Sequence, residues 1–381
     1  MLEKFLDAKP LYYDEIDYSR MPKVYEKIKT KLKNLKTIHL IGTNGKGTTG
    51  RFLASALYAK GYRVGHYTSP HIMKFNERVW INGADVSTTS LNLAHKNLLM
   101  LLTEEESNSL SYFEYTTLLA IFIFQNLDYV VLEAGLGGEY DATAVFPKVL
   151  TLVTPIDKDH EAFLGTTIKE IATTKLNAIE NRAILAEQSH SEVYAIATKL
   201  AKEKELTIYK VEELLKEQDY KKVEAISKTL SLAPYLIQNL KLSISALNLL
   251  EIEYDAKDFY NSKLFGRLTS INDNIIVDVG HNILAAQAIF NSLYPQKYIL
   301  VYNSYKDKNY KEILTVLQAI IKHIEIIDID ENRIEDRELL VKEIDNLNLQ
   351  HRKFLKIDKD EKYLVFGSFS VVEQFLKVYN A

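Results

Sequence analysis

The stretch TIHLIGTNGKGTTG, residues 37–50, runs from an apolar strand into a glycine-rich turn and then into a helix. The glycines let the backbone N–H groups of the turn point inward, and such a nest at a helix N-terminus binds anions. Lys46 adds a positive charge for the phosphates of a nucleotide, and Thr48 adds a hydroxyl that can ligate Mg²⁺. This unit predicts an α/β fold with a phosphate-binding loop.

The turn departs from the common pattern of Gly, four residues, Gly-Lys and then Ser or Thr. Leu40 occupies the place of the first glycine, and Gly47 separates Lys46 from Thr48. An ordinary tight turn is the alternative. Glycines combined with a lysine and a threonine, between a buried strand and a helix, favour the phosphate loop.

Strands and helices alternate along the first part of the chain. Strands are predicted at 37–41, 62–70, 128–135 and 149–157, and helices at 48–60, 89–103 and 111–126. This alternation is typical of a mainly parallel sheet covered on both faces, whose ligands bind at the carboxyl ends of the strands. Glu133, Asp157 and the Lys46 loop all fall at such ends.

The alternation pauses and then restarts in the last third of the chain. Residues 185–260 are expected to be helical and 261–271 to form a connection. Further strands are predicted at 274–282, 297–304, 323–330, 352–357 and 362–370, and helices at 283–292 and 309–322. We therefore expect a P-loop-type ATP-binding domain with a mainly parallel sheet over 1–262. A smaller Rossmann-like α/β domain would follow over 263–381.

Other polar residues stand where strands end. Glu133 closes a buried strand near the phosphate loop, which is the geometry used to hold Mg²⁺, unless it only caps a helix. His160 follows two aspartates and is a candidate metal ligand or base, although a surface histidine is the simpler alternative. Asp278 and His281 end a strand of the second domain, where a helix cap is the alternative. Together these residues predict an ATP–Mg²⁺ site on the first domain, over which the second closes.

Composition narrows the class of protein. The 381 residues carry a formal net charge of −4 and no cysteine, which excludes disulfides and thiolate sites and gives no basic surface for nucleic acid. Acidic residues near the amino terminus argue against a signal peptide. The most apolar stretch is interrupted well before the roughly 20 residues that a membrane span needs. We expect a cytoplasmic protein without nucleic-acid or membrane partners.

Seven stretches occur in the order found in one family: GTNGKGTT, TSPHIMKFNERVWING, SYFEYTTLLA, VVLEAGLGGEYDAT, FGRLTSI, DVGHN and GSFSVVE. Together they resemble the folylpolyglutamate synthase/dihydrofolate synthase family, a branch of the Mur-ligase superfamily. The resemblance implies a monomeric ligase that uses ATP to activate a substrate carboxylate as an acyl phosphate. The amino group of L-glutamate then attacks, and the carboxylate is that of dihydropteroate or a folate. IDYSRM, residues 16–21, stands where such enzymes place part of the pterin-binding region.

The resemblance also implies roles for individual residues in ATP and metal binding. The triphosphate would be held by Thr43, Asn44, Gly45, Lys46, Gly47 and Thr48. One Mg²⁺ would be held by Thr48, Ser69 and Glu133. His160 would bind a second Mg²⁺, and Lys175, fifteen residues later, would be carbamylated and support the metals.

The second domain would supply three further residues. Arg267 would contact the phosphates, Asp278 would face the nucleotide, and His281 would face the reacting end. By the same resemblance Lys46, Lys175 and His281 are the catalytic residues.

The chain departs from the family pattern in three places. Lys175 stands in TTKLNAI instead of Glu-Lys-Ala-Gly, and Glu139 occupies a position where a basic residue is common. The segment LIQNLKLSISALNLL carries Leu242 or Ser243 where an adenine-contacting Asn is expected, so no adenine-binding residue is assigned. A non-catalytic ATP-binding regulatory protein is therefore one alternative. A Mur-type ligase of cell-wall precursors is the other, although only 36 residues precede Thr37, too few for its amino-terminal UDP-binding domain.

Overall fold

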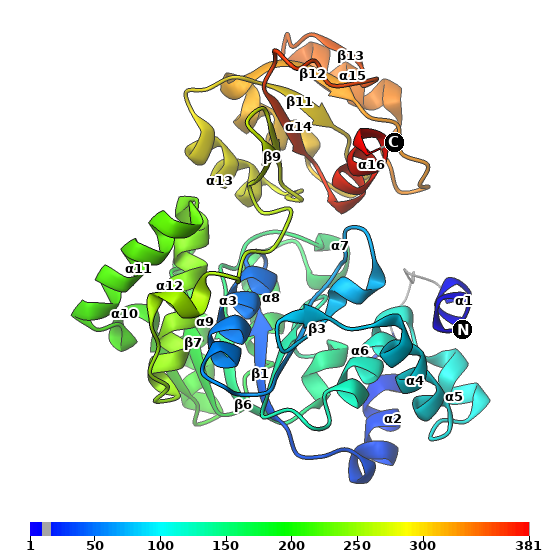
Figure 1. Cartoon of the computed structure of the whole chain (residues 1–381), viewed down its shortest axis with the longest axis vertical. Coiled ribbons are helices and arrows are strands. Elements are labelled where there is room, and N and C mark those ends of the chain that lie inside the picture. Colours follow the sequence, from blue (N-terminus) through cyan, green and yellow to red (C-terminus); the bar gives the residue numbers. More distant parts are fainter. Residues whose placement is uncertain (10–16, 381) are drawn as a thin grey trace. The chain divides into compact units, whose positions relative to one another are not determined.

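The computed structural model describes residues 1–9 and 17–380. The chain forms two compact units (Figure 1). Unit 1 comprises Met1–Leu232 and Leu236–Lys263, and unit 2 comprises Ala233–Tyr235 and Leu264–Ala381. Each unit contains one sheet, with eight strands in unit 1 and six in unit 2. In the described part of the chain, no helix is both long and apolar enough to cross a lipid bilayer.

The sheet of unit 1 has the order β4-β3-β2-β5-β1-β6-β7-β8. Its strands are β1 (Lys36–Ile41), β2 (Val64–Tyr67), β3 (Val79–Ile81), β4 (Ala84–Asp85), β5 (Tyr129–Glu133), β6 (Lys148–Val153), β7 (Arg182–Leu185) and β8 (Thr207–Lys210). At one edge of the sheet β3 pairs antiparallel with both β2 and β4, and all other pairs are parallel. The carboxyl ends of β1, β2, β5 and β6 therefore meet at the same edge of the sheet.

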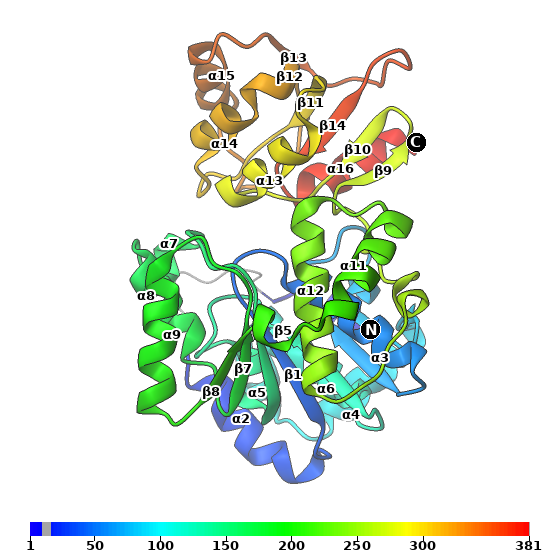
Figure 2. The ribbon, with the colours of Figure 1, turned by 90° about the vertical axis from the view of Figure 1, so that its left-hand side faces the viewer.

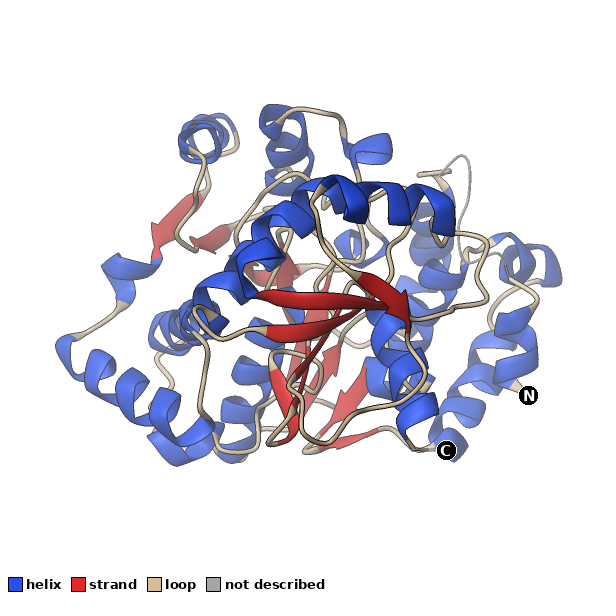
Figure 3. Cartoon of the chain, turned by 90° about the horizontal axis from the view of Figure 1, so that it is seen from above, coloured by secondary structure: helices blue, strands red, loops and turns tan. Residues whose placement is uncertain are grey.

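Helices cover both faces of this sheet (Figures 2 and 3). They are α1 (Leu2–Asp7), α2 (Arg20–Ile28), α3 (Lys46–Ala59), α4 (Thr88–Leu99), α5 (Glu104–Ser109), α6 (Tyr112–Ile123), α7 (Glu161–Leu164), α8 (Ile168–Leu176), α9 (Ser191–Glu203), α10 (Val211–Leu214), α11 (Glu217–Leu230) and α12 (Pro234–Leu249). Successive β5 residues show why both faces are apolar. Val131 packs with α3, α11 and α12, whereas Val130 and Leu132 pack with α4 and α6 on the opposite face.

Helix α3, which follows the glycine-rich turn, also packs against the antiparallel edge of the sheet. The guanidinium of Arg51 lies 5.0 Å from the ring centre of Trp80 on β3. The ring of Tyr58 meets the same indole edge-on, with the centroids 6.1 Å apart. Arg51 and Trp80 are both buried, so these contacts fix α3 against the sheet.

Unit 2 is a smaller α/β unit with the strand order β13-β12-β11-β14-β10-β9. Its strands are β9 (Thr269–Asn272), β10 (Ile275–Val277), β11 (Tyr298–Tyr302), β12 (Ile321–Ile326), β13 (His351–Lys353) and β14 (Tyr363–Phe366). All pairs are parallel except β9 with β10. Its helices are α13 (Ile283–Leu293), α14 (Tyr310–Leu317), α15 (Arg337–Asn346) and α16 (Phe369–Tyr379).

The predicted α/β fold class is confirmed, and several predicted elements need correction. The stretch 185–260 is not wholly helical, because β8 lies within it and pairs with β7. The helix predicted over 309–322 ends at Leu317, since Ile321 already pairs with Tyr298 as the first residue of β12. The helix predicted over 89–103 ends at Leu99, and the connection predicted to extend to 271 includes the start of β9.

Candidate active site

The phosphate loop connects β1 to α3, and its backbone geometry requires glycine at two positions. Gly42 has φ +136° and Gly45 has φ +91°, conformations that residues with a side chain rarely adopt. A Cβ atom at Gly42 would lie 2.0 Å from Thr154 Oγ1, and one at Gly45 would lie 2.5 Å from Asn239 Oδ1. The turn is therefore seated closely against the segment after β6 and against α12.

Lys46 and Thr48 occupy the first turn of α3, where the helix dipole favours anions. Lys46 Nζ donates to the carbonyl oxygens of Gly42 and Thr43, at 3.1 Å each. Thr48 is 3% exposed, and its Oγ1 has no hydrogen-bond partner among the described residues. A buried hydroxyl without a partner is costly, so this atom is suited to a ligand that supplies the missing interaction.

Glu133, the last residue of β5, is buried at the carboxyl edge of the sheet. Its Oε2 accepts a short hydrogen bond from Thr68 Oγ1 and a second from the backbone N–H of Ser69 at 3.2 Å. The parallel pairing of β2 with β5 brings these residues together, since Tyr67 is the register partner of Leu132. Carboxylate and hydroxyl oxygens are the ligands that Mg²⁺ prefers, so Glu133 and Thr48 fit a magnesium ion by their chemistry. Thr68 was not predicted, although it lies beside Ser69 in the sequence.

Lys175, on α8, is buried beneath the phosphate loop. Its side chain is 4% exposed, and its Nζ donates to the carbonyl oxygen of Gly42 at 2.9 Å. Burial, together with the positive charge of Lys46, lowers the pKa of Lys175 to about 7, against the opposing effect of Asp159 and Asp141. The amine is therefore partly neutral near neutral pH and able to act as a nucleophile.

Asp141 is a buried carboxylate in the glycine-rich loop after β5 that sequence reasoning missed. It accepts hydrogen bonds from the backbone N–H groups of Leu136 and Thr143, at 2.9 Å each, and from Thr143 Oγ1. Thr143 Oγ1 also contacts His39 Nε2, at 2.8 Å, beneath the sheet edge. Burial raises the pKa of Asp141. The carboxylate therefore fixes the loop that leads away from Glu133.

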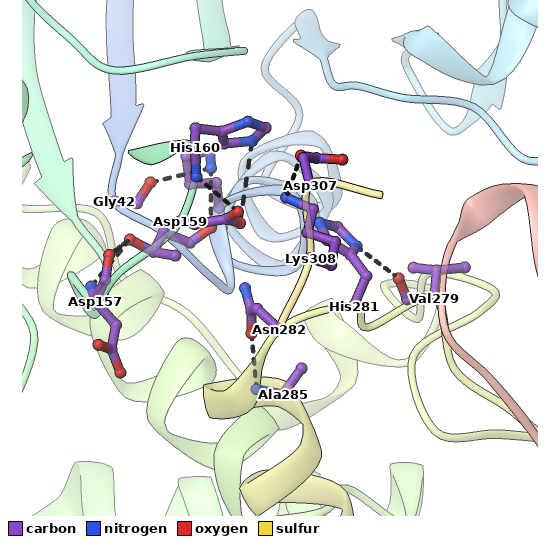
Figure 4. A network of polar contacts seen from close by, with 12 residues as sticks. Gly42, Asp157, Asp159, His160, Val279, His281, Asn282, Ala285, Asp307 and Lys308 are labelled. Carbon is purple, nitrogen blue, oxygen red and sulfur yellow. Dashed lines mark hydrogen bonds and ion pairs between the residues drawn. The ribbon is translucent and has the colours of Figure 1, made fainter. Parts of the chain in front are cut away.

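His160 precedes α7 and has a left-handed backbone conformation, with φ +53°. Its Nε2 lies 4.0 Å from Asp159 Oδ2 (Figure 4). Asp157 lies nearby in sequence and pairs through Oδ1 with His190 Nε2 at 3.1 Å. In residues 1–9 and 17–380, no group of three or more His, Asp or Glu side chains gathers as a metal cluster. The second metal ion at His160 stays a prediction.

Asp278, at the carboxyl end of β10 in unit 2, is 4% exposed and fully engaged within that unit. Its carboxylate accepts from the N–H groups of Leu268 and Gly280, at 2.8 Å each, and from the hydroxyl of Tyr235 at 2.9 Å. Burial raises the pKa of Asp278, and Arg267 opposes this effect. The guanidinium of Arg267 lies 5.3 Å from the ring centre of Phe369. Tyr235 was not predicted as part of this group.

His281 and Asn282 follow Asp278 in the loop that leads to α13. Nδ1 of His281 lies 3.1 Å from the carbonyl oxygen of Val279, which orients the imidazole (Figure 4). Asn282 accepts a hydrogen bond from the N–H of Ala285 at 2.9 Å and so caps α13. The alternative role considered for Asp278 and His281 is to cap the helix that follows them. Asn282 is the residue that caps this helix, α13.

Comparison with known proteins places this arrangement in a family. No family model matches the chain. The dihydrofolate synthase/folylpolyglutamate synthase of Buchnera aphidicola subsp. Schizaphis graminum is 30% identical over 383 aligned residues, which cover 91% of this chain and 89% of that protein. The crystal structure of Helicobacter pylori folylpolyglutamate synthetase is 37% identical, with a TM-score of 0.81 and coverage of 100% and 98% of the two chains.

A third similar protein was solved with ligands. It is the bifunctional folylpolyglutamate synthase/dihydrofolate synthase of Yersinia pestis, complexed with AMPPNP and a Mn ion. The TM-score is 0.82 at 24% identity, covering 99% of this chain and 96% of the other. At 24% identity, this structural similarity shows a shared fold alone.

The two-unit α/β fold, the phosphate loop and these relatives together define an ATP-dependent ligase. The chain belongs to the dihydrofolate synthase/folylpolyglutamate synthase family. This finding favours the family predicted from the ordered motifs over a Mur-type ligase of cell-wall precursors and over a non-catalytic regulatory protein.

Proposed function

We propose that this protein joins L-glutamate to the carboxylate of dihydropteroate, of a folate, or of both in turn. The observation that carries the proposal is the phosphate loop and the helix that follows it. Lys46 and Thr48 lie in the first turn of α3, and the Thr48 hydroxyl is buried without a hydrogen-bond partner among the described residues. Family membership supplies the substrate class, because the relatives are named for both the synthase and the polyglutamate reaction.

The reaction divides into two balanced steps. The substrate carboxylate attacks the γ-phosphorus of ATP, which forms an acyl phosphate and releases ADP. The amino group of L-glutamate then attacks the acyl carbon, and an amide forms as inorganic phosphate leaves. Lys46, the loop residues Thr43 and Asn44, and the N–H groups of Gly45, Gly47 and Thr48 would hold the triphosphate and stabilise the charge that develops during phosphoryl transfer.

Thr48, Ser69 and Glu133 would hold one Mg²⁺, and a divalent cation there would offset phosphate charge. The orphaned Thr48 hydroxyl and the buried Glu133 carboxylate support this assignment. The Yersinia pestis protein binds an ATP analogue together with Mn, which is consistent with a divalent metal at the nucleotide. A second Mg²⁺ at His160 stays a prediction.

Lys175 would act as a carbamate. A neutral lysine amine adds to CO₂, which gives a carbamate anion and releases one proton. The burial of Lys175 and its pKa of about 7 support this step, because only the unprotonated amine reacts. A carbamate there would place a negative charge beneath the loop, close to the positive charge of Lys46 and of any metal ion bound there.

The roles of the unit 2 residues are proposed from the family alone. Arg267 would contact the phosphates, Asp278 the nucleotide, and His281 the reacting end of the substrate. The pterin-binding assignment of IDYSRM falls partly on Ile16, which lies outside the described residues. The monomeric state and the cytoplasmic location stay predictions from the sequence.

The deciding experiment measures ATP consumption with L-glutamate and, in turn, dihydropteroate, tetrahydrofolate or a UDP-muramyl acceptor. We expect turnover with at least one of the two pterin substrates and none with the UDP-muramyl compound. Turnover with dihydropteroate alone would restrict the enzyme to the synthase reaction. Failure with both pterin substrates would contradict the proposed function.

A further inference from the structure

The phosphate loop rests on a segment outside the sheet, residues 154–157, which follows β6. The N–H of Thr43 donates to the carbonyl oxygen of Pro155 at 2.8 Å. Thr43 Oγ1 donates to the carbonyl oxygen of Asp157 at 2.9 Å and accepts from the N–H of Asp157 at 3.0 Å. The position of the loop is therefore set by where this segment lies.

The sheet holds only the start of this segment, where the N–H of Thr154 donates to the carbonyl oxygen of Ile41 on β1 at 2.9 Å. β6 ends at Val153 and β7 at Leu185, and the last bond between these two strands runs from the N–H of Ala186 to the carbonyl oxygen of Val153. Beyond these bonds, the remaining backbone groups of residues 154–157 need other partners, since buried N–H and C=O groups are costly when unpaired.

Gln188, in the loop after β7, supplies two of those partners with its side chain, whereas Thr43 supplies the partners of Pro155 and Asp157. Its Oε1 accepts from the N–H of Ile156 at 2.8 Å. Its Nε2 donates to the carbonyl oxygen of Ala186 at 2.9 Å and more weakly to that of Thr154 at 3.4 Å. The amide thus bridges the ends of the two strands as a further rung of the ladder would.

Two observations indicate that this bridge is rigid. Gln188 is 7% exposed, and its own N–H donates to the hydroxyl of Tyr194 on α9 at 2.9 Å. The neighbouring pair of His190 with Asp157 also contacts this segment, but the two side chains are 32% and 26% exposed, which weakens a pair of this kind. Gln188 is therefore the stronger constraint.

We propose that Gln188 is a positioning residue for nucleotide binding, which acts through residues 154–157 on Thr43 of the phosphate loop. The inference rests on the proposed function, because it assumes that the loop binds ATP. A shift of a few tenths of an ångström in this segment would move the N–H groups that face the phosphates, and binding by preorganised donors is sensitive to such shifts.

The test compares Gln188→Met, which fills the same space without an amide, with the matched variant Asn248→Leu. Asn248, on α12, likewise donates its amide to a backbone carbonyl, that of Leu214 at 2.9 Å, and also to Asp219 Oδ2 at 2.7 Å, and neither partner belongs to the phosphate loop. Binding of Mg–ADP is measured by titration calorimetry, with thermal melting of each protein. We expect about tenfold weaker Mg–ADP binding for Gln188→Met and a change below about twofold for Asn248→Leu.

A double-mutant cycle separates positioning from a general loss of stability. Thr43→Val removes the hydroxyl that grips Asp157. If Gln188 acts through this contact between Thr43 and Asp157, the two substitutions are not independent. The loss of Mg–ADP affinity in the double variant is then smaller than the product of the two single losses. Strict additivity would overturn the inference, as would equal Mg–ADP affinity in Gln188→Met and Asn248→Leu. If Gln188→Met does not fold, Gln188→Leu carries the same expectation, since it also removes both the acceptor and the donor.

Binding of Mg–ADP by the wild-type protein distinguishes a failure of the proposed function from a failure of the role proposed for Gln188. A wild-type protein that does not bind Mg–ADP would contradict the proposed function and, with it, this inference. A wild-type protein that binds Mg–ADP, with no effect of Gln188→Met, would contradict the inference alone.

Discussion

The Nζ of Lys175 donates a hydrogen bond to the backbone carbonyl of Gly42, the first residue of the phosphate loop, at 2.9 Å. The two residues lie 133 positions apart in the sequence, and both are buried at the carboxyl edge of the sheet. The lysine proposed to carry a carbamate is thus coupled directly to the loop proposed to bind ATP. Any change at Lys175 is expected to reach the nucleotide site through this contact.

Lys175→Ala should lose ligase activity, and a small carboxylate such as acetate or formate should restore part of it. The added anion would occupy the space that the carbamate fills in the wild-type protein. ATP consumption with the pterin substrate and L-glutamate is the measurement, with Lys169→Ala on the exposed side of the same helix as control. Wild-type activity in Lys175→Ala would remove the carbamate proposal.

Lys175 should also make the stability of the metal-free protein depend on pH. Its pKa is about 7 in the folded protein and 10.5 in the unfolded chain, so the unfolded state binds more protons between these values. Stability should therefore rise with pH across this window, by an amount on the order of a few kcal/mol. Below about pH 7 the cost of burying the charged lysine is present in full.

The measurement for this pH effect is the free energy of unfolding in CO₂-free buffer, compared with Lys175→Met. The methionine variant should be the more stable protein at pH 7, and its advantage should shrink as the pH rises. A constant difference between the two proteins across the window would contradict the low pKa.

Thr48→Val should weaken magnesium-dependent nucleotide binding by about tenfold or more, because it removes the hydroxyl proposed to ligate Mg²⁺. The cost in stability should be small, since Thr48 Oγ1 makes no hydrogen bond in the described chain. The matched control is Thr49→Val, whose hydroxyl is equally buried and equally without a partner there. Equal Mg–ADP affinities for the two variants would show that Thr48 has no special role.

Gly42→Ala should abolish ATP binding and destabilise the protein. A Cβ atom would collide with Thr154 Oγ1 at 2.0 Å in addition to the strain of φ +136°. Gly61→Ala is the control, because Gly61 has φ +90° but no atom within 4 Å of an added Cβ. That variant should lose only about 1–2 kcal/mol of stability and keep nucleotide affinity. Calorimetric binding and thermal melting of both variants test the difference.

Local patterns made part of the candidate site predictable from the sequence. Long apolar runs mark β1, β5 and β6, and the carboxyl ends of parallel strands must lie on one edge, so Lys46 and Glu133 could be assigned to that edge. The glycine-rich turn of residues 42–47 likewise predicts a strand before it and a helix after it. These features depend on residues that are neighbours in the sequence.

Other features depend on contacts between distant residues and could not be predicted in this way. The hydroxyl of Tyr235 donates to Asp278, which lies 43 positions later in the sequence. The sequence around Tyr235 predicts only a helix and gives no sign of this contact. Gln188 lies in a short loop without a recognisable motif. Its contacts with residues 154–157 depend on the pairing of β7 with β6, which the sequence does not show. Strand β8 was missed because its four residues are partly exposed and flanked by charged helices, which conceals a strand pattern.

The contact between Arg51 and Trp80 also has a practical consequence. Trp80 is the only tryptophan of the 381 residues, and it is buried against the helix that begins at the phosphate loop. Its fluorescence emission therefore reports on unit 1 alone, whereas circular dichroism records the helices of both units. A denaturation followed by both signals would reveal whether the units unfold in one transition or in two, and coincident midpoints would indicate a single cooperative transition.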